Sequence, residues 1–314
     1  MGGAEPIPLE PGHDPIVLDG GLATELEARG HDLSDRLWSA RLLVTEPQAI
    51  EDVHLAYYRA GARVAITASY QATVPGFAAA GLDRAAALAA IRRSVRLAQA
   101  ARERADAEGV EGDAVRLVAG SVGPYATVLA DGSEYRGDYD PGPAVLREVH
   151  APRIDALLEA GADLLALETI PTVREAEVLV RLVEERHAPA WLSYQCRDGQ
   201  STAAGEPIAD AIAVADAAPD LVAVGVNCTS PHHVPELLAA AAAVTSRPLI
   251  AYPNGGDTWD PVARRWSDNP AGGGFDAVAV ATWTDLGARW LGGCCRTGPA
   301  DITALARALA DRAT

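Results

Sequence analysis

The sequence predicts a single-domain α/β protein with the fold of a (β/α)8 barrel of the TIM type. Eight short runs rich in Val, Ile, Leu and Ala recur along the 314 residues, and longer segments with helical periodicity separate them. This alternation is typical of a parallel sheet wrapped by helices. A doubly wound open sheet is the alternative, but the first turn, "DGGLAT", lacks the Gly-rich pattern of that fold. No linker divides the chain, so residues 16–314 are expected to form one barrel domain after an N-terminal extension at residues 1–15.

Each expected strand is an apolar run, and the first and last read "IVLDGG" and "RWLGGCC". The eight strands are expected, in order, at residues 16–21, 63–69, 116–123, 163–170, 190–196, 221–228, 248–255 and 289–295. Several helices end in Ala-Gly directly before a strand, as at residues 60–61 and 160–161, where a glycine favours the end of a helix. The expected helices cover residues 47–60, 85–107, 142–160, 173–186 and 234–244, and another follows Gly298 and Pro299. Long loops are expected at residues 30–46, 71–82, 124–141 and 254–271.

Composition and charge exclude several classes of partner. The net charge is −17, and nucleic acids or anionic membranes require clustered Lys and Arg, so neither is expected as a partner. No basic segment followed by an apolar one begins the chain, and no apolar run approaches the roughly 18 residues of a membrane span. A cytoplasmic protein is therefore expected. In a reducing cytosol its four cysteines serve metal binding, catalysis or core packing rather than disulfides.

Polar residues gather where the expected strands end. In a barrel of this kind the active site is built at the carboxyl ends of the strands, so these residues are the candidates for a functional site. They are, in strand order, Asp19-Gly20-Gly21, Thr67 to Tyr70, Gly120-Ser121, Glu168-Thr169, Gln195-Cys196, Asn227-Cys228, Tyr252 to Asn254 and Cys294-Cys295. Packing alone does not explain why carboxylates, amides and thiols collect at one end of otherwise apolar strands.

Three cysteines are expected to converge on one metal ion. Cys228 ends the sixth strand, and Cys294 and Cys295 end the eighth, so a single strand separates them in a barrel. Three thiolates in a tetrahedral array describe a catalytic zinc site with an open fourth position. Neighbouring residues of a strand point to opposite faces, so Cys294 and Cys295 reach one ion only where the backbone turns. Cys196 stands alone after an apolar strand and is expected in the core.

The histidines are not expected to bind the metal. Four of them, namely His150, His187, His232 and His233, fall in or near helices and loops rather than at strand ends. Buried small hydrophobic packing, or a labile thiol pair, is the alternative explanation for the clustered cysteines.

Six motifs in order resemble the homocysteine S-methyltransferases, from about residue 16 to residue 312. They are "LDGGLATELEARG", "GSVGPYATVLADGSEYRGDY", "LLALETIPTVREAE", "GVNCTSP", "YPNGG" and "LGGCCRTGP". The resemblance implies a zinc-dependent (β/α)8 barrel that transfers a methyl group to homocysteine and forms methionine. It also implies that Cys228, Cys294 and Cys295 bind the zinc and that the sulfur of homocysteine takes the open position.

The resemblance further implies where the amino-acid part of homocysteine binds. Asp19 and Glu168 match the acids that hold its ammonium group, and backbone amides near Gly20 and Gly21 meet its carboxylate. Three further candidates for substrate contact lie at strand ends, namely Thr67, Ser121 and Asn227.

The methyl donor is expected to be a sulfonium compound. The motifs "ADGSEYRGDY" and "ETIPTVREAE" resemble enzymes that use S-methylmethionine, with S-adenosylmethionine as the nearest alternative. Betaine enzymes surround a quaternary ammonium with aromatic rings. Trp38 matches one wall of that cage, but Gln71 and Thr169 stand where two tyrosines are expected. The aromatic residues placed to meet a sulfonium donor are Trp38, Tyr70, Tyr125 and Tyr139.

Two functions of other classes remain as alternatives. A zinc hydrolase or deaminase would use a metal-bound water, but the chain lacks the His ligands and the P-C-x-x-C signature of the deaminases. A noncatalytic protein with structural zinc would close its site with four ligands. The three cysteines singled out here are far apart in the sequence and leave one position open.

Overall fold

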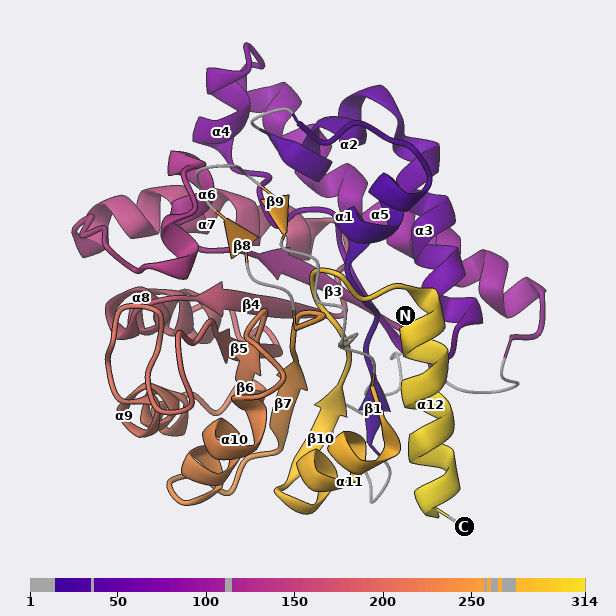
Figure 1. Cartoon of the computed structure of the whole chain (residues 1–314). Helices are drawn as coiled ribbons and strands as arrows, with labels where there is room; N and C mark the ends of the chain where they lie inside the picture. Colours follow the sequence, from indigo (N-terminus) through magenta and orange to yellow (C-terminus); the bar gives the residue numbers. More distant parts are fainter. Residues whose placement is uncertain are drawn as a thin grey trace.

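The computed structural model describes residues 15–34, 37–110, 115–256, 259–260, 265–266 and 275–313. Eight parallel strands form one sheet in the order β1-β10-β7-β6-β5-β4-β3-β2 (Figure 1). Their bounds are β1 Ile16–Val17, β2 Val64–Ile66, β3 Leu117–Val122, β4 Leu164–Ile170, β5 Ala190–Tyr194, β6 Leu221–Asn227, β7 Leu249–Tyr252 and β10 Ala288–Leu291. Leu18 pairs with Val64 in a parallel bridge, and the Asp19 amide donates to the Val64 carbonyl at 3.0 Å. These contacts join the two outer strands, and the predicted (β/α)8 barrel is confirmed.

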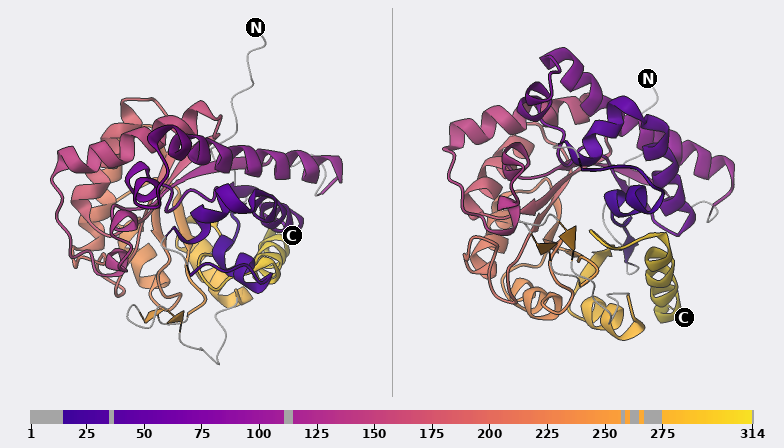
Figure 2. Two further views of the ribbon diagram at one scale, coloured as in Figure 1. Left: turned by 90° about the horizontal axis from the view of Figure 1, so that it is seen from above. Right: turned by 45° about the horizontal axis from the view of Figure 1, so that its top comes forward.

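Helices surround the strands, as the two further views in Figure 2 show. The α-helices are α1 Leu22–Ala28, α2 Leu42–Thr45, α3 Pro47–Arg59, α4 Val74–Ala79, α5 Arg84–Ala107, α6 Ala126–Leu129, α7 Pro143–Glu159, α8 Val173–Glu184, α9 Ile208–Ala213, α10 Val234–Ala242, α11 Ala277–Asp285 and α12 Pro299–Ala313. Three 3₁₀ helices, η1 Trp38–Arg41, η2 Ser133–Tyr135 and η3 Val214–Ala217, complete the helical set in the described ranges. A separate two-stranded antiparallel pair consists of β8 Trp259–Asp260 and β9 Arg265–Trp266.

Local signals explain where several helices begin and end. The Asp83 side chain accepts a hydrogen bond from the Ala86 amide at 2.8 Å and caps α5. The Thr172 hydroxyl caps α8 in the same way, at 3.2 Å from the Glu175 amide. Gly61 follows α3 with a φ of 102°, a left-handed conformation that glycine adopts without a Cβ penalty. The sequence thus marks the starts of α5 and α8 and the end of α3.

Large side chains fill the interior of the barrel. Alternate strand residues point inward, and the large inward side chains Trp191, Tyr252 and Trp290 are almost completely buried. The Trp191 ring lies 6.1 Å from that of Tyr252 and 6.0 Å from that of Trp290. Trp191 Nε1 donates to the Tyr252 hydroxyl at 2.9 Å, which satisfies a polar group that burial would otherwise leave unpaired. The opposite strand faces pack against the helices in a second apolar cluster.

Several strands and loops differ in their bounds from those expected from the sequence. The last strand ends at Leu291 and not at Cys295, because the backbone turns at the glycines that follow it. Three of the expected loops contain short helices: residues 30–46 hold η1 and α2, residues 71–82 hold α4, and residues 124–141 hold α6 and η2. Three further short helices, α1, α9 and α11, were not among those named from the sequence. Residues 1–14 of the expected extension, and much of the expected loop at 254–271, lie outside the described residues.

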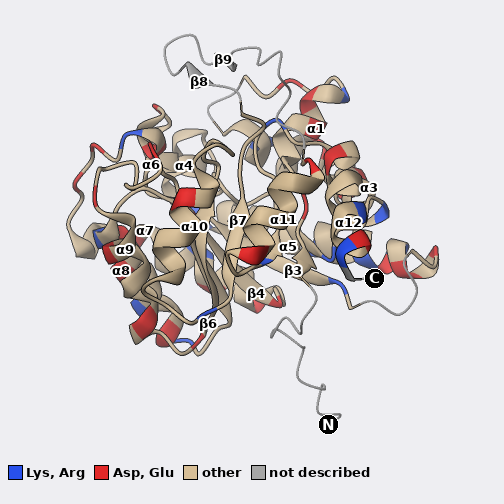
Figure 3. Ribbon diagram, turned by 60° about the horizontal axis from the view of Figure 1, so that its bottom comes forward, with Lys and Arg blue, Asp and Glu red and all other residues tan. Residues whose placement is uncertain are grey.

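Charged residues lie mainly on the outer helices, where acidic and basic side chains are interspersed (Figure 3). Within the eight barrel strands the charged side chains are those of Glu168 and Arg289. In the described part of the chain, no helix combines the length and apolar character that crossing a membrane requires. Arg289 is partly exposed, so Glu168 is the buried charged residue of these strands.

Candidate metal and substrate site

A cavity of about 690 Å³ opens at the carboxyl ends of the barrel strands. Segments that follow β1, β2, β3, β6 and β10 line it, together with η1 and the ends of β4 and β7. Among the lining residues are Gly20, Gly21, Trp38, Thr67, Tyr70, Glu134, Tyr135, Glu168, Cys228, Cys294 and Cys295. The end of the barrel expected from the sequence to carry the site thus holds a pocket of substrate size.

The three cysteine thiols meet at this pocket. The Sγ atoms of Cys228, Cys294 and Cys295 all lie within 4.8 Å of one another, and those of Cys228 and Cys295 are 3.7 Å apart. Sulfurs bound at 2.3 Å in a tetrahedral zinc site are separated by roughly 3.8 Å, so the donor set fits such an ion. Cys228 has a φ of 49°, and Cys294 and Cys295 lie in the turn after β10. The expectation that a backbone turn brings neighbouring cysteines together agrees with this geometry.

The thiols also influence one another electrostatically. Hydrogen bonding from Cys294 and Cys295 holds the pKa of the Cys228 thiol well below its usual value. The same shared hydrogen bonds raise the pKa of the Cys294 thiol. Close packing therefore favours a thiolate at Cys228, and thiolates are the form in which cysteine binds metals.

A buried amide clamp holds the strand end beside Cys228. Asn227 Oδ1 accepts hydrogen bonds from the Thr169 amide at 2.7 Å and from the Ser193 hydroxyl at 2.9 Å. Its Nδ2 donates to Thr169 Oγ1 at 2.8 Å. Thr169 has a φ of 60°, which is unfavourable for a β-branched residue. Asn227 thus lies behind the pocket wall and fixes the backbone of β4 next to that of β6.

Two buried carboxyl groups lie near the pocket. Glu168 lines it and accepts a hydrogen bond from the Ser121 hydroxyl, and burial raises the pKa of Glu168 to about 7. Asp19 Oδ2 accepts from the Ile66 amide at 2.8 Å, whereas Asp19 Oδ1 is buried without a hydrogen-bond partner in the described part of the chain. Burial raises the pKa of Asp19 well above its usual range. Burial thus favours the neutral form of both groups, and a nearby positive charge would favour the carboxylate form.

The remaining strand-end candidates have different surroundings. Gly20 and Gly21 line the pocket, but the Gly21 amide already donates to the Thr297 carbonyl at 2.9 Å. Thr67 lines the pocket as well, and its hydroxyl accepts from the Ser121 amide at 3.0 Å. Ser121 and Asn227 are fully buried and are not among the lining residues. Direct substrate contact by these residues stays a prediction.

Aromatic side chains form one wall of the pocket. The rings of Trp38 and Tyr70 meet edge to face, with 6.4 Å between their centroids. Tyr135, which sequence reasoning missed, places its hydroxyl 3.7 Å from Cys228 Sγ. Tyr125 and Tyr139, which were named instead, do not line the pocket, and the Tyr139 hydroxyl donates to Glu175 at 2.6 Å. The motif "ADGSEYRGDY" contained Glu134 and Tyr135, but nothing in its spacing indicated which tyrosine faces the thiols.

Cys196 and the described histidines lie outside the thiol cluster. Cys196 is buried in the apolar cluster outside the barrel, which confirms its expected core role. The group of potential metal ligands in the described ranges consists of the three clustered cysteines without any histidine.

Comparisons with known proteins define the class of this barrel. A family model described as homocysteine S-methyltransferase matches residues 16–309. The chain belongs to the homocysteine S-methyltransferase family and is a methyltransferase. It is 49% identical to the homocysteine S-methyltransferase of Escherichia coli strain K12 over 93% of this chain and 94% of the relative.

Two further comparisons extend this result. The chain is 42% identical to the selenocysteine Se-methyltransferase of Brassica oleracea var. italica, over 94% of this chain and 90% of the relative. The crystal structure of the E. coli homocysteine methyltransferase MmuM in its metallated form is similar, with a TM-score of 0.84 and 47% identity. That match covers 94% of this chain and 96% of the crystal structure's chain.

Proposed function

We propose that this homocysteine S-methyltransferase takes its methyl group from S-methylmethionine and holds zinc at Cys228, Cys294 and Cys295. The observation that carries the proposal is the group of three thiols, all within 4.8 Å, on the wall of a cavity of about 690 Å³. Three protein ligands in an accessible pocket leave one coordination position for a substrate atom. The sulfur of homocysteine is the ligand proposed for that position.

The chemistry that zinc supplies when bound is the deprotonation of the acceptor thiol near neutral pH. The chain's own part is to hold three thiolate ligands at fixed positions and to orient the substrate. Asp19 and Glu168 are proposed to bind the ammonium group of homocysteine. Asp19 Oδ1 lacks a partner in the described part of the chain, and a bound ammonium would satisfy it and lower the pKa of both carboxyl groups.

The charge of the pocket supports a cationic donor. Its wall includes five acidic residues, namely Glu27, Asp32, Asp131, Glu134 and Glu168, whereas Arg296 is the basic side chain there apart from His31. A sulfonium compound brings a positive charge that such a wall attracts. Its leaving group departs as a neutral thioether, so the reaction requires no general acid.

The aromatic residues of the pocket wall also bear on which methyl donor binds. A betaine donor calls for rings on several sides of its quaternary ammonium. Here Trp38 and Tyr70 supply one edge-to-face pair and Tyr135 lies beside Cys228. Gln71 and Thr169, which are not aromatic, occupy two other positions of the wall. This arrangement favours a sulfonium over betaine, with S-adenosylmethionine as the second candidate.

A donor competition assay tests the proposal. Purified protein loaded with zinc is given homocysteine with equal concentrations of S-methylmethionine, S-adenosylmethionine and betaine, each labelled differently in its methyl group. Methionine labelled from S-methylmethionine is the expected product. Methionine labelled only from betaine would refute the donor assignment.

Two cysteine variants test the metal site. Cys228→Ala is expected to lose zinc and methyl transfer while its far-UV circular dichroism stays that of a folded barrel. Cys196→Ala is the matched control, because Cys196 is a core residue that belongs to no thiol cluster, and it should keep its zinc. Full zinc content in Cys228→Ala would contradict the assigned ligands.

A further inference from the structure

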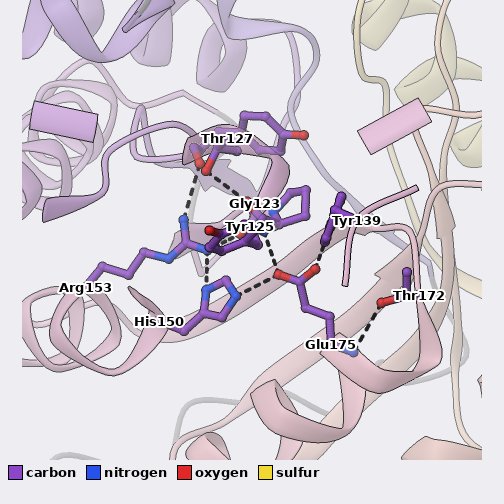
Figure 4. A network of polar contacts seen from close by, with 10 residues as sticks. Gly123, Tyr125, Thr127, Tyr139, His150, Arg153, Thr172 and Glu175 are labelled. Carbon is purple, nitrogen blue, oxygen red and sulfur yellow. Dashed lines mark hydrogen bonds and ion pairs between the residues drawn. The ribbon is translucent and has the colours of Figure 1, made fainter. Parts of the chain in front are cut away.

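A buried polar network lies behind the pocket wall, between α7 and α8 (Figure 4). It consists of His150 and Arg153 on α7 and Glu175 on α8, and all three side chains are fully buried. Taking a carboxylate and a guanidinium out of water is costly unless both are paired and fully hydrogen-bonded. Such a group calls for a role beyond packing.

The geometry of the network shows which ring nitrogen of His150 carries the proton. Arg153 Nη2 lies 2.5 Å from His150 Nδ1, and His150 Nε2 lies 2.7 Å from Glu175 Oε1. A guanidinium only donates hydrogen bonds, so His150 Nδ1 accepts and the proton is on Nε2, which donates to Glu175. Burial lowers the pKa of His150, in keeping with this neutral form. A neutral imidazole therefore links a buried cation to a buried anion.

The outer atoms of the network form hydrogen bonds near both ends of one loop. Glu175 Oε1 accepts from the Tyr125 amide at 2.6 Å, and Oε2 accepts from the Tyr139 hydroxyl at 2.6 Å. Arg153 Nη2 also donates to the Gly123 carbonyl (Figure 4). The residues from 123 to 139, called here the β3 loop, are thus attached near both ends to the same buried charges.

The β3 loop forms part of the pocket wall. It carries Glu134 and Tyr135, which line the pocket, and the Tyr135 hydroxyl contacts Cys228 Sγ. The network also reaches Tyr70, because Arg153 Nη1 donates to the Tyr70 carbonyl at 3.4 Å. A Cβ atom at Gly123 would lie 2.7 Å from the Tyr70 ring, so that ring packs directly on the loop backbone. Pocket residues from two loops therefore depend on one network.

We propose that Glu175, His150 and Arg153 form a positioning unit for the methyl-donor side of the site. Of the two residues proposed to bind homocysteine, Asp19 follows β1 and Glu168 lies on β4. The β3 loop and Tyr70 form a different part of the pocket wall, which remains for the donor. The unit fixes this wall without touching the reacting groups. The assignment to the donor rests on the proposed function, whereas the ordering of the loop does not.

A pair of tyrosine variants separates positioning from general stability. Tyr139→Phe removes a hydroxyl of a half-buried ring that donates to Glu175 at 2.6 Å. Tyr194→Phe removes a buried hydroxyl that donates to the Ala211 carbonyl at 2.7 Å, away from the pocket. Hydrogen–deuterium exchange of residues 124–139, zinc content, and the KM values for homocysteine and for S-methylmethionine are measured for both. Glu175→Gln, which keeps the side-chain volume but removes the charge, is the stronger second variant.

Tyr139→Phe is expected to speed exchange in the β3 loop by about five- to tenfold and to raise the donor KM by a similar factor. Zinc content and the homocysteine KM should stay as in the wild type, and Tyr194→Phe should change neither loop exchange nor the donor KM. Unchanged loop exchange in Tyr139→Phe, or equal effects of both variants, would overturn the proposal. If the wild-type protein does not use S-methylmethionine, the donor assignment fails separately, and the exchange measurement still tests the loop.

Discussion

The clamp around Thr169 yields a quantitative prediction for Asn227→Ala. Asn227 makes three buried hydrogen bonds, two of them to Thr169 and one to the Ser193 hydroxyl. A buried group that loses its partner costs about 1–3 kcal/mol, but Ser193 keeps the Tyr252 hydroxyl at 2.7 Å as a second partner. The expected loss of unfolding free energy is therefore about 3 kcal/mol, most of it from the Thr169 amide and hydroxyl.

Backbone strain at Thr169 offers an internal check on this reasoning. The left-handed φ of 60° costs an L-residue about 1–2 kcal/mol, and glycine avoids that cost but loses about 0.5–1 kcal/mol to chain entropy. Thr169→Gly should therefore recover about 0.5–1 kcal/mol in the Asn227→Ala background, where the clamp no longer holds the turn. The two variants are expected to be strongly non-additive, because they share the same contacts.

Equilibrium unfolding in urea, followed by far-UV circular dichroism, measures both quantities. The midpoint should fall in Asn227→Ala at an unchanged m value. A loss below about 1 kcal/mol, or additive effects of the two substitutions, would refute the clamp as the reason that Thr169 adopts this conformation.

Three further predictions follow from the packing. His54 is fully buried with both ring nitrogens unpartnered in the described structure, and burial lowers its pKa to about 4. The unfolded chain binds a proton at His54 below about pH 6.5, whereas the folded chain does so only near pH 4, so the free energy of unfolding falls as the pH drops from 6.5 toward 4. His54→Leu should make this fall smaller by roughly 2 kcal/mol between pH 7 and pH 5, as measured by urea titrations. Gly225→Ala would place a Cβ 2.0 Å from the Ile250 carbonyl oxygen and should lower the free energy of unfolding by at least about 3 kcal/mol. Gly142→Ala meets no atom within 4 Å and should lower it by less than about 1 kcal/mol. Similar melting temperatures for the two variants would contradict this reasoning. Trp191→Phe removes barrel volume and the donor to Tyr252, and calorimetry should show a loss of about 2–3 kcal/mol.

The barrel and the thiol cluster were predictable because both follow from regular alternation along the chain. Apolar runs mark the parallel strands, and parallel strands place their carboxyl ends at one side of the barrel. Cys228 and the Cys294-Cys295 pair therefore had to approach each other, whichever helices lay between them. The expected strand ends were too long by up to four residues at the last strand, because apolar composition does not register where the backbone turns.

The β3 loop shows why the rest of the site was not predictable. Its direction depends on buried contacts with Arg153 and Glu175, which lie on two later helices. No local pattern in residues 124–141 encodes those contacts. Sequence reasoning consequently assigned Tyr125 and Tyr139 to the pocket, whereas Tyr135 lies beside Cys228. The hydrogen bonds between the Asn227 side chain and Thr169 were not predictable either, because they join the ends of two separate strands.

The contact between the β1 turn and the turn after β10 has a consequence for biosynthesis. Thr297 accepts a hydrogen bond from the Gly21 amide, and the Tyr57 hydroxyl lies 2.9 Å from the Gly21 carbonyl and 3.0 Å from that of Thr297. A ribosome makes Gly21 and Cys228 long before it makes Cys294. During translation Cys228 therefore emerges before the two other thiols of the cluster, and the cluster is complete only when the turn after β10 docks beside the first strand. A nascent chain that stalls before residue 294 is expected to expose Cys228 without its partner thiols, so the proposed metal site can form only after synthesis has passed the turn after β10.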